Sequence, residues 1–242
     1  MQAPITLIPQ AVVKAVGGDM LRGRQYNRAE LAEAADGGDA TVVRQRSIHD
    51  GYREKFEAVM QALGTIDPTR TPEAGLLDIR GKADKALESL AARATEATKA
   101  TKEAIISIDA EITKRLAIVD NAHGAEIRSH VRSLKKGERG TFVLAAIEAG
   151  DTTTMGALLS APAYLSGLTD AEQTNLGETY RSRHCGDLMK RKALYELTLK
   201  INDTAFNELL ASFGSLFAPE RVSSIQQRAA AAARARESIH TV

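Results

Sequence analysis

The amino-acid sequence predicts an all-α protein built around a long antiparallel helical hairpin with coiled-coil-like packing. Small and apolar residues recur about every 3.6 residues from Leu76 to Leu134, which is the period of one face of an α-helix. A second run, from Thr169 to Phe217, places leucine and aromatic side chains at helical spacings. Aromatic residues make up only 4% of the chain and tryptophan is absent, so closely packed helices fit the composition better than a thick core does.

The N-terminal region, residues 1–70, is expected to form an extended arm followed by short helices. Pro4 and Pro9 disfavour helix around them, because proline lacks the backbone N–H that a helix interior needs. Asn27 and Glu30 have the spacing of a capping box, which predicts a short helix with Asn27 as its N-cap. The sequence leaves open whether the arm folds on its own subunit or reaches another one.

Two further helix starts carry capping signals. Asp39 is expected to cap a helix over residues 40–63. Thr71 is expected to cap the first long helix, with Pro72 at its first position, where the missing N–H has no cost.

The two long helices are expected to pair within one chain over residues 71–218. The first is expected to reach Lys135 if it is unbroken, and the sequence leaves open whether it bends at Gly124. Thr169 and Glu172 form another capping-box pattern at the start of the return helix. Because a helix as long as the first cannot fold back on itself, its apolar stripe needs this partner.

Residues 137–168 are expected to form a helical cap at the hairpin end. The cap contains two short helices, the second of which is capped by Asp151 and ended by Pro162. Its apolar residues either seal the end of the bundle, or Tyr164 and Leu165 face outward and dock on another subunit, since exposed apolar patches mark interfaces. The residues expected in the cap are Phe142, Leu144, Ile147, Leu158, Leu159, Tyr164 and Leu165.

Basic residues gather near the same hairpin end. Antiparallel pairing brings the end of the first long helix close to the start of the second. These residues either form a solvated helix end that complements the C-terminal dipole, or a basic surface for an acidic protein or a nucleic-acid backbone. They are Arg128, Arg132, Lys135, Lys136, Arg139, Arg181 and Arg183.

Residues 219–242 predict a C-terminal helix that is rich in alanine and arginine and begins at Pro219. It either packs its small face on its own or an adjacent subunit, or reaches nucleic acid or an acidic neighbour. The basic residues of this helix are Arg221, Arg228, Arg234 and Arg236.

No residue pattern predicts catalysis. His184 and Cys185 are adjacent, so on a helix their side chains point about 100° apart, unlike a nucleophile and its base. His123, Glu126 and His130 share one helical face, as metal ligands do in some bundles, but the return helix offers no matching Glu-x-x-His pair. We therefore expect no enzymatic activity, no metal and no cofactor.

The overall charge gives no steer toward DNA or membrane, because 32 Lys and Arg residues nearly balance 31 Asp and Glu residues. No run of apolar residues is long enough to predict a membrane span, and the N-terminus is a poor signal peptide. The lone Cys185 excludes an intrachain disulfide, which is compatible with a reducing compartment.

The stretch AIEAGDTTTMGALLSAPAYLSGLTDAE, residues 146–172, resembles a segment of uncharacterised proteins encoded among the virion structural genes of tailed bacteriophages. The resemblance covers these residues alone and carries no functional residue. It implies a small helical virion protein that joins portal to tail, binds the capsid or sits inside the particle for ejection.

The leading hypothesis is a non-enzymatic structural protein of a large assembly, a tailed-phage virion component such as a head–tail connector or a capsid-associated protein. Its partners would be further copies of itself and other virion proteins, and it would be made in the host cytoplasm. The alternative is a cytoplasmic helical binding module that contacts nucleic acid or an acidic partner through the basic hairpin end.

Overall fold

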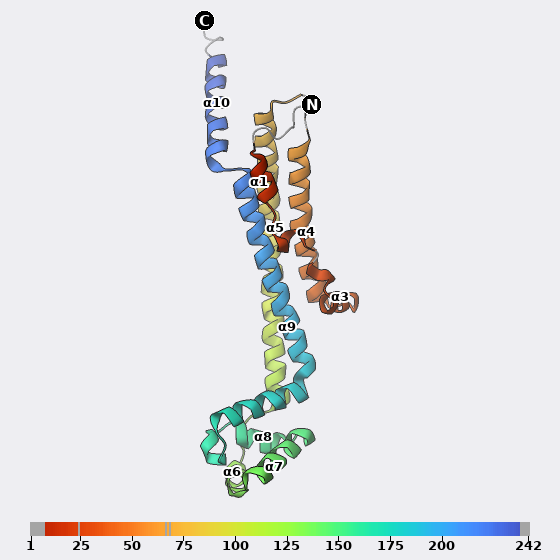
Figure 1. Ribbon diagram of the computed structural model, residues 1–242, viewed down its shortest axis with the longest axis vertical. Coiled ribbons are helices and arrows are strands. Elements are labelled where there is room, and N and C mark those ends of the chain that lie inside the picture. Colours follow the sequence, from red (N-terminus) through yellow and green to blue (C-terminus); the bar gives the residue numbers. More distant parts are fainter. Residues whose placement is uncertain (1–7, 24, 66, 68, 238–242) are drawn as a thin grey trace. The chain divides into compact units, whose positions relative to one another are not determined.

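The computed structural model describes residues 8–23, 25–65, 67 and 69–237, so the predictions for Pro4 and for residues 238–242 lie outside the described residues. Every regular element within these ranges is a helix, which confirms the predicted all-α class (Figure 1). Short 3-10 helices are η1 (Gln25–Asn27) and η2 (Ala163–Ser166). The α-helices are α1 (Gln10–Ala15), α2 (Asp19–Arg22), α3 (Ala29–Asp36), α4 (Ala40–Gly64), α5 (Pro72–Leu116), α6 (Gly124–Ser133), α7 (Lys136–Ala149), α8 (Thr152–Leu159), α9 (Asp170–Leu216) and α10 (Pro219–Glu237).

The chain divides into two compact units, which are described separately. Unit 1 comprises Met1–Thr101 and Glu196–Val242, and unit 2 comprises Lys102–Tyr195. The long helices α5 and α9 each have one segment in unit 1 and another segment in unit 2. The N-terminal helices and the alanine-rich α10 belong to unit 1, whereas the helical cap predicted at the hairpin end belongs to unit 2.

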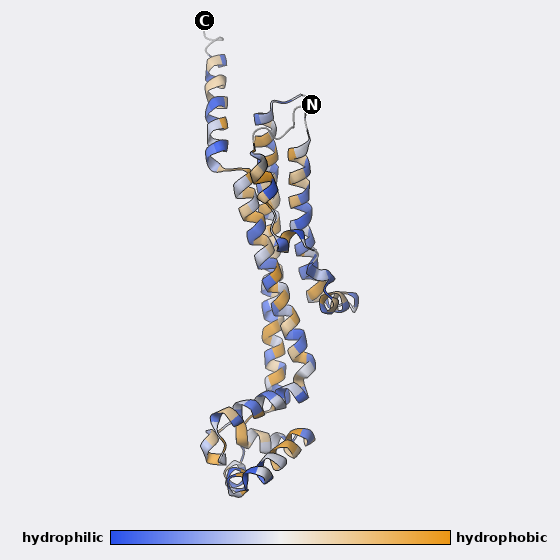
Figure 2. Cartoon of the chain, in the orientation of Figure 1, coloured by the Kyte–Doolittle hydropathy of each residue, from blue (hydrophilic) through white to orange (hydrophobic). Residues whose placement is uncertain are grey.

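Apolar side chains of α4, α5 and α9 hold unit 1 together. Along α4, Ile48, Tyr52, Phe56, Val59 and Leu63 are buried at the spacing of one helical face. Apolar residues recur along all three helices in Figure 2, and each large side chain that is fully buried stabilises the fold by about 1.5–3 kcal/mol. The facing residues are Leu76, Ala83, Leu90 and Ala97 from α5, and Ala205, Leu209, Phe213 and Leu216 from α9.

The described part of the N-terminal region folds on its own chain. Val16 and Leu21 are buried in the core of unit 1. The Gly17 N–H donates to the Ser212 hydroxyl at 2.9 Å, and the Leu21 N–H donates to the Glu208 carboxylate at 2.7 Å. Gly17 has a φ of +81°, a left-handed conformation that glycine adopts readily. These residues therefore pack against α9 of the same chain.

A buried polar layer crosses the bundle of unit 1. The Gln45 amide donates to the Thr101 hydroxyl at 2.7 Å, and the Asn202 amide donates to the Gln45 side-chain oxygen at 2.6 Å. The Tyr26 hydroxyl donates to the Asn202 side-chain oxygen at 3.3 Å. All four residues are buried, and they connect η1, α4, α5 and α9. A shift in helix register would leave these groups without partners, so the layer selects one register.

We expect Gln45→Ala to lower the free energy of unfolding by about 1–3 kcal/mol, because it removes the side-chain acceptor of the buried Asn202 amide. Urea unfolding followed by circular dichroism measures the loss. Gln61→Ala is the matched control, since Gln61 is exposed on the same helix. Equal losses for the two variants would contradict a stabilising polar layer.

His49 is buried where α4 meets the N-terminal segment. Its Nε2 lies 2.9 Å from the Met20 carbonyl oxygen, and its ring centroid lies 5.4 Å from that of Tyr26. Burial lowers the pKa of His49 below its usual value, against smaller opposing effects from the Met20 carbonyl and the carboxylates of Asp50 and Glu208. The imidazole is therefore held neutral in the fold.

The lowered pKa of His49 determines how this residue makes the stability of the fold depend on pH. As the pH falls through about 6.5, the unfolded chain binds a proton at this histidine before the folded chain does. We expect the contribution of neutral His49 to the free energy of unfolding to be fully present above that pH and to be lost progressively below it. His49→Gln keeps a donor for Met20 but does not titrate, so the urea midpoint of this variant should fall less between about pH 7.5 and about pH 5.5. His123→Gln, at an exposed histidine, is the control, and a wild-type pH profile for His49→Gln would refute the assignment.

The first long helix is shorter than predicted. α5 ends at Leu116, so the prediction that it continues to Lys135 is wrong, and a loop over residues 117–123 precedes α6. Ala117 has a φ of +46°, which is incompatible with a continuing right-handed helix. The small and apolar residues keep their helical spacing through the loop. Periodicity alone therefore does not predict that α5 ends at Leu116.

The predicted helix boundaries otherwise agree closely with the structure, with one exception. The capping box at Asn27 and Glu30 is wrong, because Asn27 lies in η1 and α3 begins at Ala29 without a side-chain cap. The helix predicted over residues 40–63 is confirmed as α4. Side-chain caps are confirmed at Asp39, Thr71, Asp151 and Thr169.

Candidate interaction surface of unit 2

Unit 2 is organised around a second apolar core. α6 and α8 pack together, and α7 and η2 contact both of them. Within this unit α9 bends at Cys185, whose φ of −133° is not helical (Figure 1). The neighbouring His184 has its Nε2 2.6 Å from the Ile147 carbonyl oxygen, which ties the bend to α7. The core residues are Leu116, Val131, Val143, Ala146, Ile147, Met155, Leu158, Leu176, Tyr180 and Cys185.

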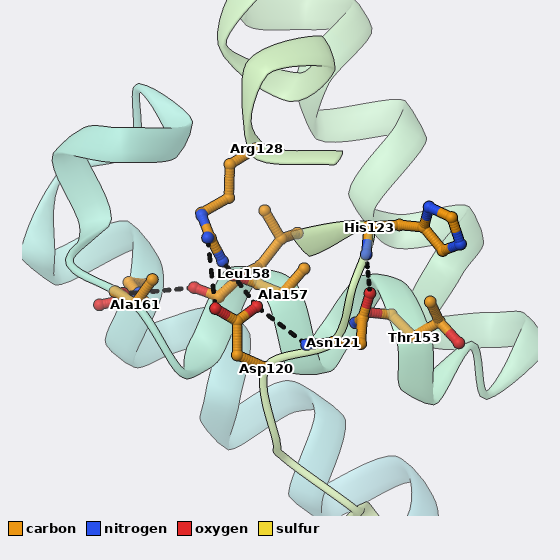
Figure 3. Close-up of polar contacts among 9 residues, drawn as sticks. Asp120, Asn121, His123, Arg128, Thr153, Ala157, Leu158 and Ala161 are labelled. Atoms are coloured by element: carbon orange, nitrogen blue, oxygen red, sulfur yellow. Dashed lines mark hydrogen bonds and ion pairs between the residues drawn. The ribbon is translucent and has the colours of Figure 1, made fainter. Parts of the chain in front are cut away.

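Polar contacts hold the loop between α5 and α6 against α8 (Figure 3). The Arg128 guanidinium donates to the Asp120 carboxylate at 3.0 Å and to the Ala157 carbonyl at 3.0 Å. The Asn121 amide donates to the Thr153 carbonyl at 3.0 Å. The hydrogen bond from Arg128 is the main reason why the pKa of Asp120 lies below its usual range. Arg128, with a side chain only 12% exposed, therefore serves the fold of unit 2.

Arg139 is also used inside unit 2. Its guanidinium donates to the carbonyl oxygens of Val131 and Leu134, each at 3.1 Å, and to that of Gly167. The first two carbonyls lie at the C-terminal end of α6, where unpaired carbonyl groups concentrate partial negative charge. The predicted role of a cation that complements a helix dipole therefore describes Arg139. The helix concerned is α6, however, and not a continuous α5.

The other predicted basic residues lie on the surface of unit 2. Lys136 Nζ lies 3.9 Å from the Glu172 carboxylate, and the Arg183 guanidinium lies 3.8 Å from the Glu148 carboxylate. These are long, solvent-exposed pairs, which contribute little to stability. Their cations are therefore accessible to an external anionic group. The exposed basic set, as used below, is Arg132, Lys135, Lys136, Arg181 and Arg183.

Among the described residues of unit 2, the large apolar side chains that are more than half exposed are Ile106, Val119, Leu144 and Tyr164. Tyr164 in η2 is 68% exposed, although its neighbour Ala163 is buried, and Leu165 is half-buried. Leu144 in α7 is 58% exposed, so its predicted place inside the apolar cap is wrong. The buried residues of α7 are Val143, Ala146 and Ile147, and Leu144 points roughly 100° away from the centre of the face that they form. Residues 142–147 are all apolar, so the sequence alone does not distinguish Leu144 as the exposed position.

The candidate catalytic and metal-binding residues have ordinary structural contacts. His123 Nδ1 lies 3.4 Å from the Glu126 carboxylate, and the His130 ring packs edge-on against Phe142 at 5.3 Å between centroids. Among the described residues, no three His, Cys, Asp or Glu side chains lie close enough to hold a metal ion. Burial raises the pKa of the Cys185 thiol, which disfavours the thiolate that nucleophilic chemistry needs.

The fold and the surface together define an all-α protein of two helical units, in which exposed apolar and basic side chains on unit 2 form the candidate interaction surface. No family model, curated protein or solved structure matches this chain. Over the described residues, none of the helices combines the length and the apolar character needed to cross a bilayer.

We expect Arg139→Met to destabilise unit 2 by about 2 kcal/mol or more, because it leaves buried helix-end carbonyls without a charged donor. Hydrogen exchange of α6 and α8 amides locates the effect within this unit. Arg132→Met, at an exposed arginine nearby in the chain, should change exchange by less than about 0.5 kcal/mol. Matching exchange in the two variants would show that Arg139 is not structural.

Proposed function

We propose that this chain is a non-enzymatic structural protein of a large assembly and that unit 2 docks on a protein partner. The observation that carries the proposal is the exposure of Tyr164 and Leu144 on the short helices of unit 2, where they add to the exposed Ile106 and Val119 of the same unit. Tyrosine contributes a large rigid contact area and a hydroxyl, which makes it common at interfaces. The exposed basic set on the same unit favours an acidic partner surface.

The resemblance of residues 146–172 supports a particular assembly, the virion of a tailed phage, at the head–tail region or on the capsid. The segment spans the end of α7, all of α8 and η2, and the start of α9, so it includes Tyr164. The proposed partners are further copies of this chain and other virion proteins, after synthesis in the host cytoplasm.

The roles of the strongest polar groups support a non-enzymatic function. Arg128, Arg139 and His184 are bound to backbone carbonyls or to a loop carboxylate of unit 2. In unit 1, Gln45 and Asn202 are bound to each other and to neighbouring helices. These groups are occupied in maintaining helix contacts, whereas a catalytic site needs convergent groups that face a substrate.

The alternative is a binding module that contacts nucleic acid or an acidic protein through the exposed basic set alone. Its support is that these cations have only long, solvent-exposed partners or none among the contacts described above. Contacts of this kind weaken steeply as the salt concentration rises, because bound counterions are released.

We expect the double variant Tyr164→Ser, Leu144→Ser to lose association with purified virions of the phage that encodes this chain, measured by co-sedimentation. Removing a central aromatic anchor typically costs about 2 kcal/mol or more of binding free energy. Ile106→Ser is the control, because Ile106 in the same unit is also 68% exposed.

Two results would count against the proposal. Absence of wild-type protein from purified virions, by mass spectrometry and by co-sedimentation, would reject the virion assembly. Binding to duplex DNA that falls steeply with salt, and that is lost when the exposed basic set is changed to alanine, would favour the binding module instead.

A further inference from the structure

The first described residues form a strap across unit 1. Residues 8–22, called the strap below, pack on α4 and α9, and Figure 1 shows α1 beside α9. The regular elements of the strap are α1 and α2, which have only 6 and 4 residues. Helices this short are not stable alone in water, so the strap keeps its structure only while it is packed on unit 1. Its buried residues are Ile8, Val16 and Leu21.

Hydrogen bonds to the strap gather at its C-terminal end. The Glu208 carboxylate of α9 accepts from the N–H groups of Met20 and Leu21, at 3.4 Å and 2.7 Å. From α4, His49 Nε2 donates to the Met20 carbonyl oxygen at 2.9 Å, since a carbonyl oxygen can only accept. Together with the contact to Ser212, these bonds hold the end of the strap against both α4 and α9.

The core of unit 1 depends little on the strap. Most of its buried residues belong to α4, α5 and α9, which pack on one another along their apolar faces. A segment that contributes few buried contacts opens at a lower free energy than the core that it covers, because its opening exposes less apolar surface. The strap can therefore be released while the three long helices stay packed.

Release of the strap would uncover apolar surface of α4. The Arg22 guanidinium lies 5.7 Å from the centroid of the Phe56 ring, and a Cβ added to Gly17 would lie against the same ring. The strap thus covers one side of Phe56, which is only 6% exposed. Burial of this apolar surface favours the closed strap.

His49 lies beneath the strap and can bind a proton near neutral pH. Burial is the main reason why its pKa is lowered, and the strap is part of that burial. When the strap lifts, water reaches the imidazole and its pKa returns toward about 6.5. The released state therefore binds a proton at a higher pH than the closed state does, so acid favours release. The charged groups that act on His49 are Asp50, Arg53 and Glu208, and those of α2 are the exposed Asp19 and Arg22.

We propose that residues 8–22 form an acid-sensitive strap: protonation of His49 releases them from α4 and α9 and uncovers the surface around Phe56, while the rest of unit 1 stays folded. Above about pH 6.5 the imidazole is neutral, and its bond to the Met20 carbonyl helps to hold the strap closed. Below that pH the charged imidazolium is more stable in water than beneath the strap. The strap acts within unit 1 and is independent of the docking proposed for unit 2.

Hydrogen exchange of the full chain at about pH 7.5 and about pH 5.5 tests the proposal. Protection is expressed relative to an unstructured chain at the same pH, which removes the chemical effect of pH on exchange. Residues 17–22 should be less protected than residues 48–63 of α4 at both pH values, because release needs no unfolding of the core. Their protection should also fall at the lower pH by up to about tenfold, the limit for one histidine that has a pKa of about 6.5 only when the strap is open.

Variants separate the histidine from the other contacts of the strap. His49→Gln keeps a donor for the Met20 carbonyl but does not titrate, so its strap should be equally protected at the two pH values. In Gly18→Ala the added Cβ would displace the Glu208 carboxylate, which should lower strap protection at both pH values without any proton. Gly64→Ala, where an added Cβ meets nothing within 4 Å, is the matched control and should exchange as the wild type does. Circular dichroism checks that each variant keeps its helicity.

Three outcomes would overturn the proposal. Equal protection of the strap and of residues 48–63 would show that the strap opens only when the core of unit 1 unfolds. Strap protection that is the same at both pH values, or that falls as much in His49→Gln as in the wild type, would show that His49 does not control release. Unchanged strap protection in Gly18→Ala would show that the bonds to Glu208 do not hold the strap.

Discussion

The scarcity of large side chains is the constraint on which the rest of the structure depends. A helix whose buried face includes Ala83 and Ala97 removes little apolar area from water per residue, so it is stable only when neighbouring helices approach closely along much of its length. Close approach brings backbone and polar groups into the interior as well, and these then require partners. The polar layer around Gln45 in unit 1 and the arginine contacts in unit 2 meet this requirement.

How well the sequence predicts a structural feature depends on how far apart in the chain the interacting residues lie. Caps such as Asp39 and Thr169 involve residues two or three positions apart, so a local pattern was sufficient to predict them. The end of α5 at Leu116 involves contacts between the loop and α8, far along the chain, and no local pattern contains them. The small and apolar stripe continued across the break because residues of the loop and of α6 are also partly buried, in a different arrangement.

On the candidate surface, too, some features follow from the local sequence and others depend on contacts between distant parts of the chain. One of the two predicted arrangements places Tyr164 outward, and Tyr164 is exposed, whereas Leu144 lies in an unbroken apolar run, Phe142 to Ile147, that does not mark it as a surface residue. Charge and position in the chain predict which residues are basic and near the hairpin end, but they do not determine whether a guanidinium turns inward. Arg128 and Arg139 turn inward because carbonyl oxygens left at helix ends need donors, and arginine supplies several at once.

The bend of α9 places the only cysteine of the sequence in the interior of unit 2, and unit 1 has none. A thiol reagent in solution reaches Cys185 only when this part of unit 2 opens, and the raised pKa of the thiol slows the reaction further. The rate of labelling in the native state therefore reports the opening of the interior of unit 2, either by local opening or by unfolding of the whole chain. The chain thus contains its own chemical probe for the interior of unit 2.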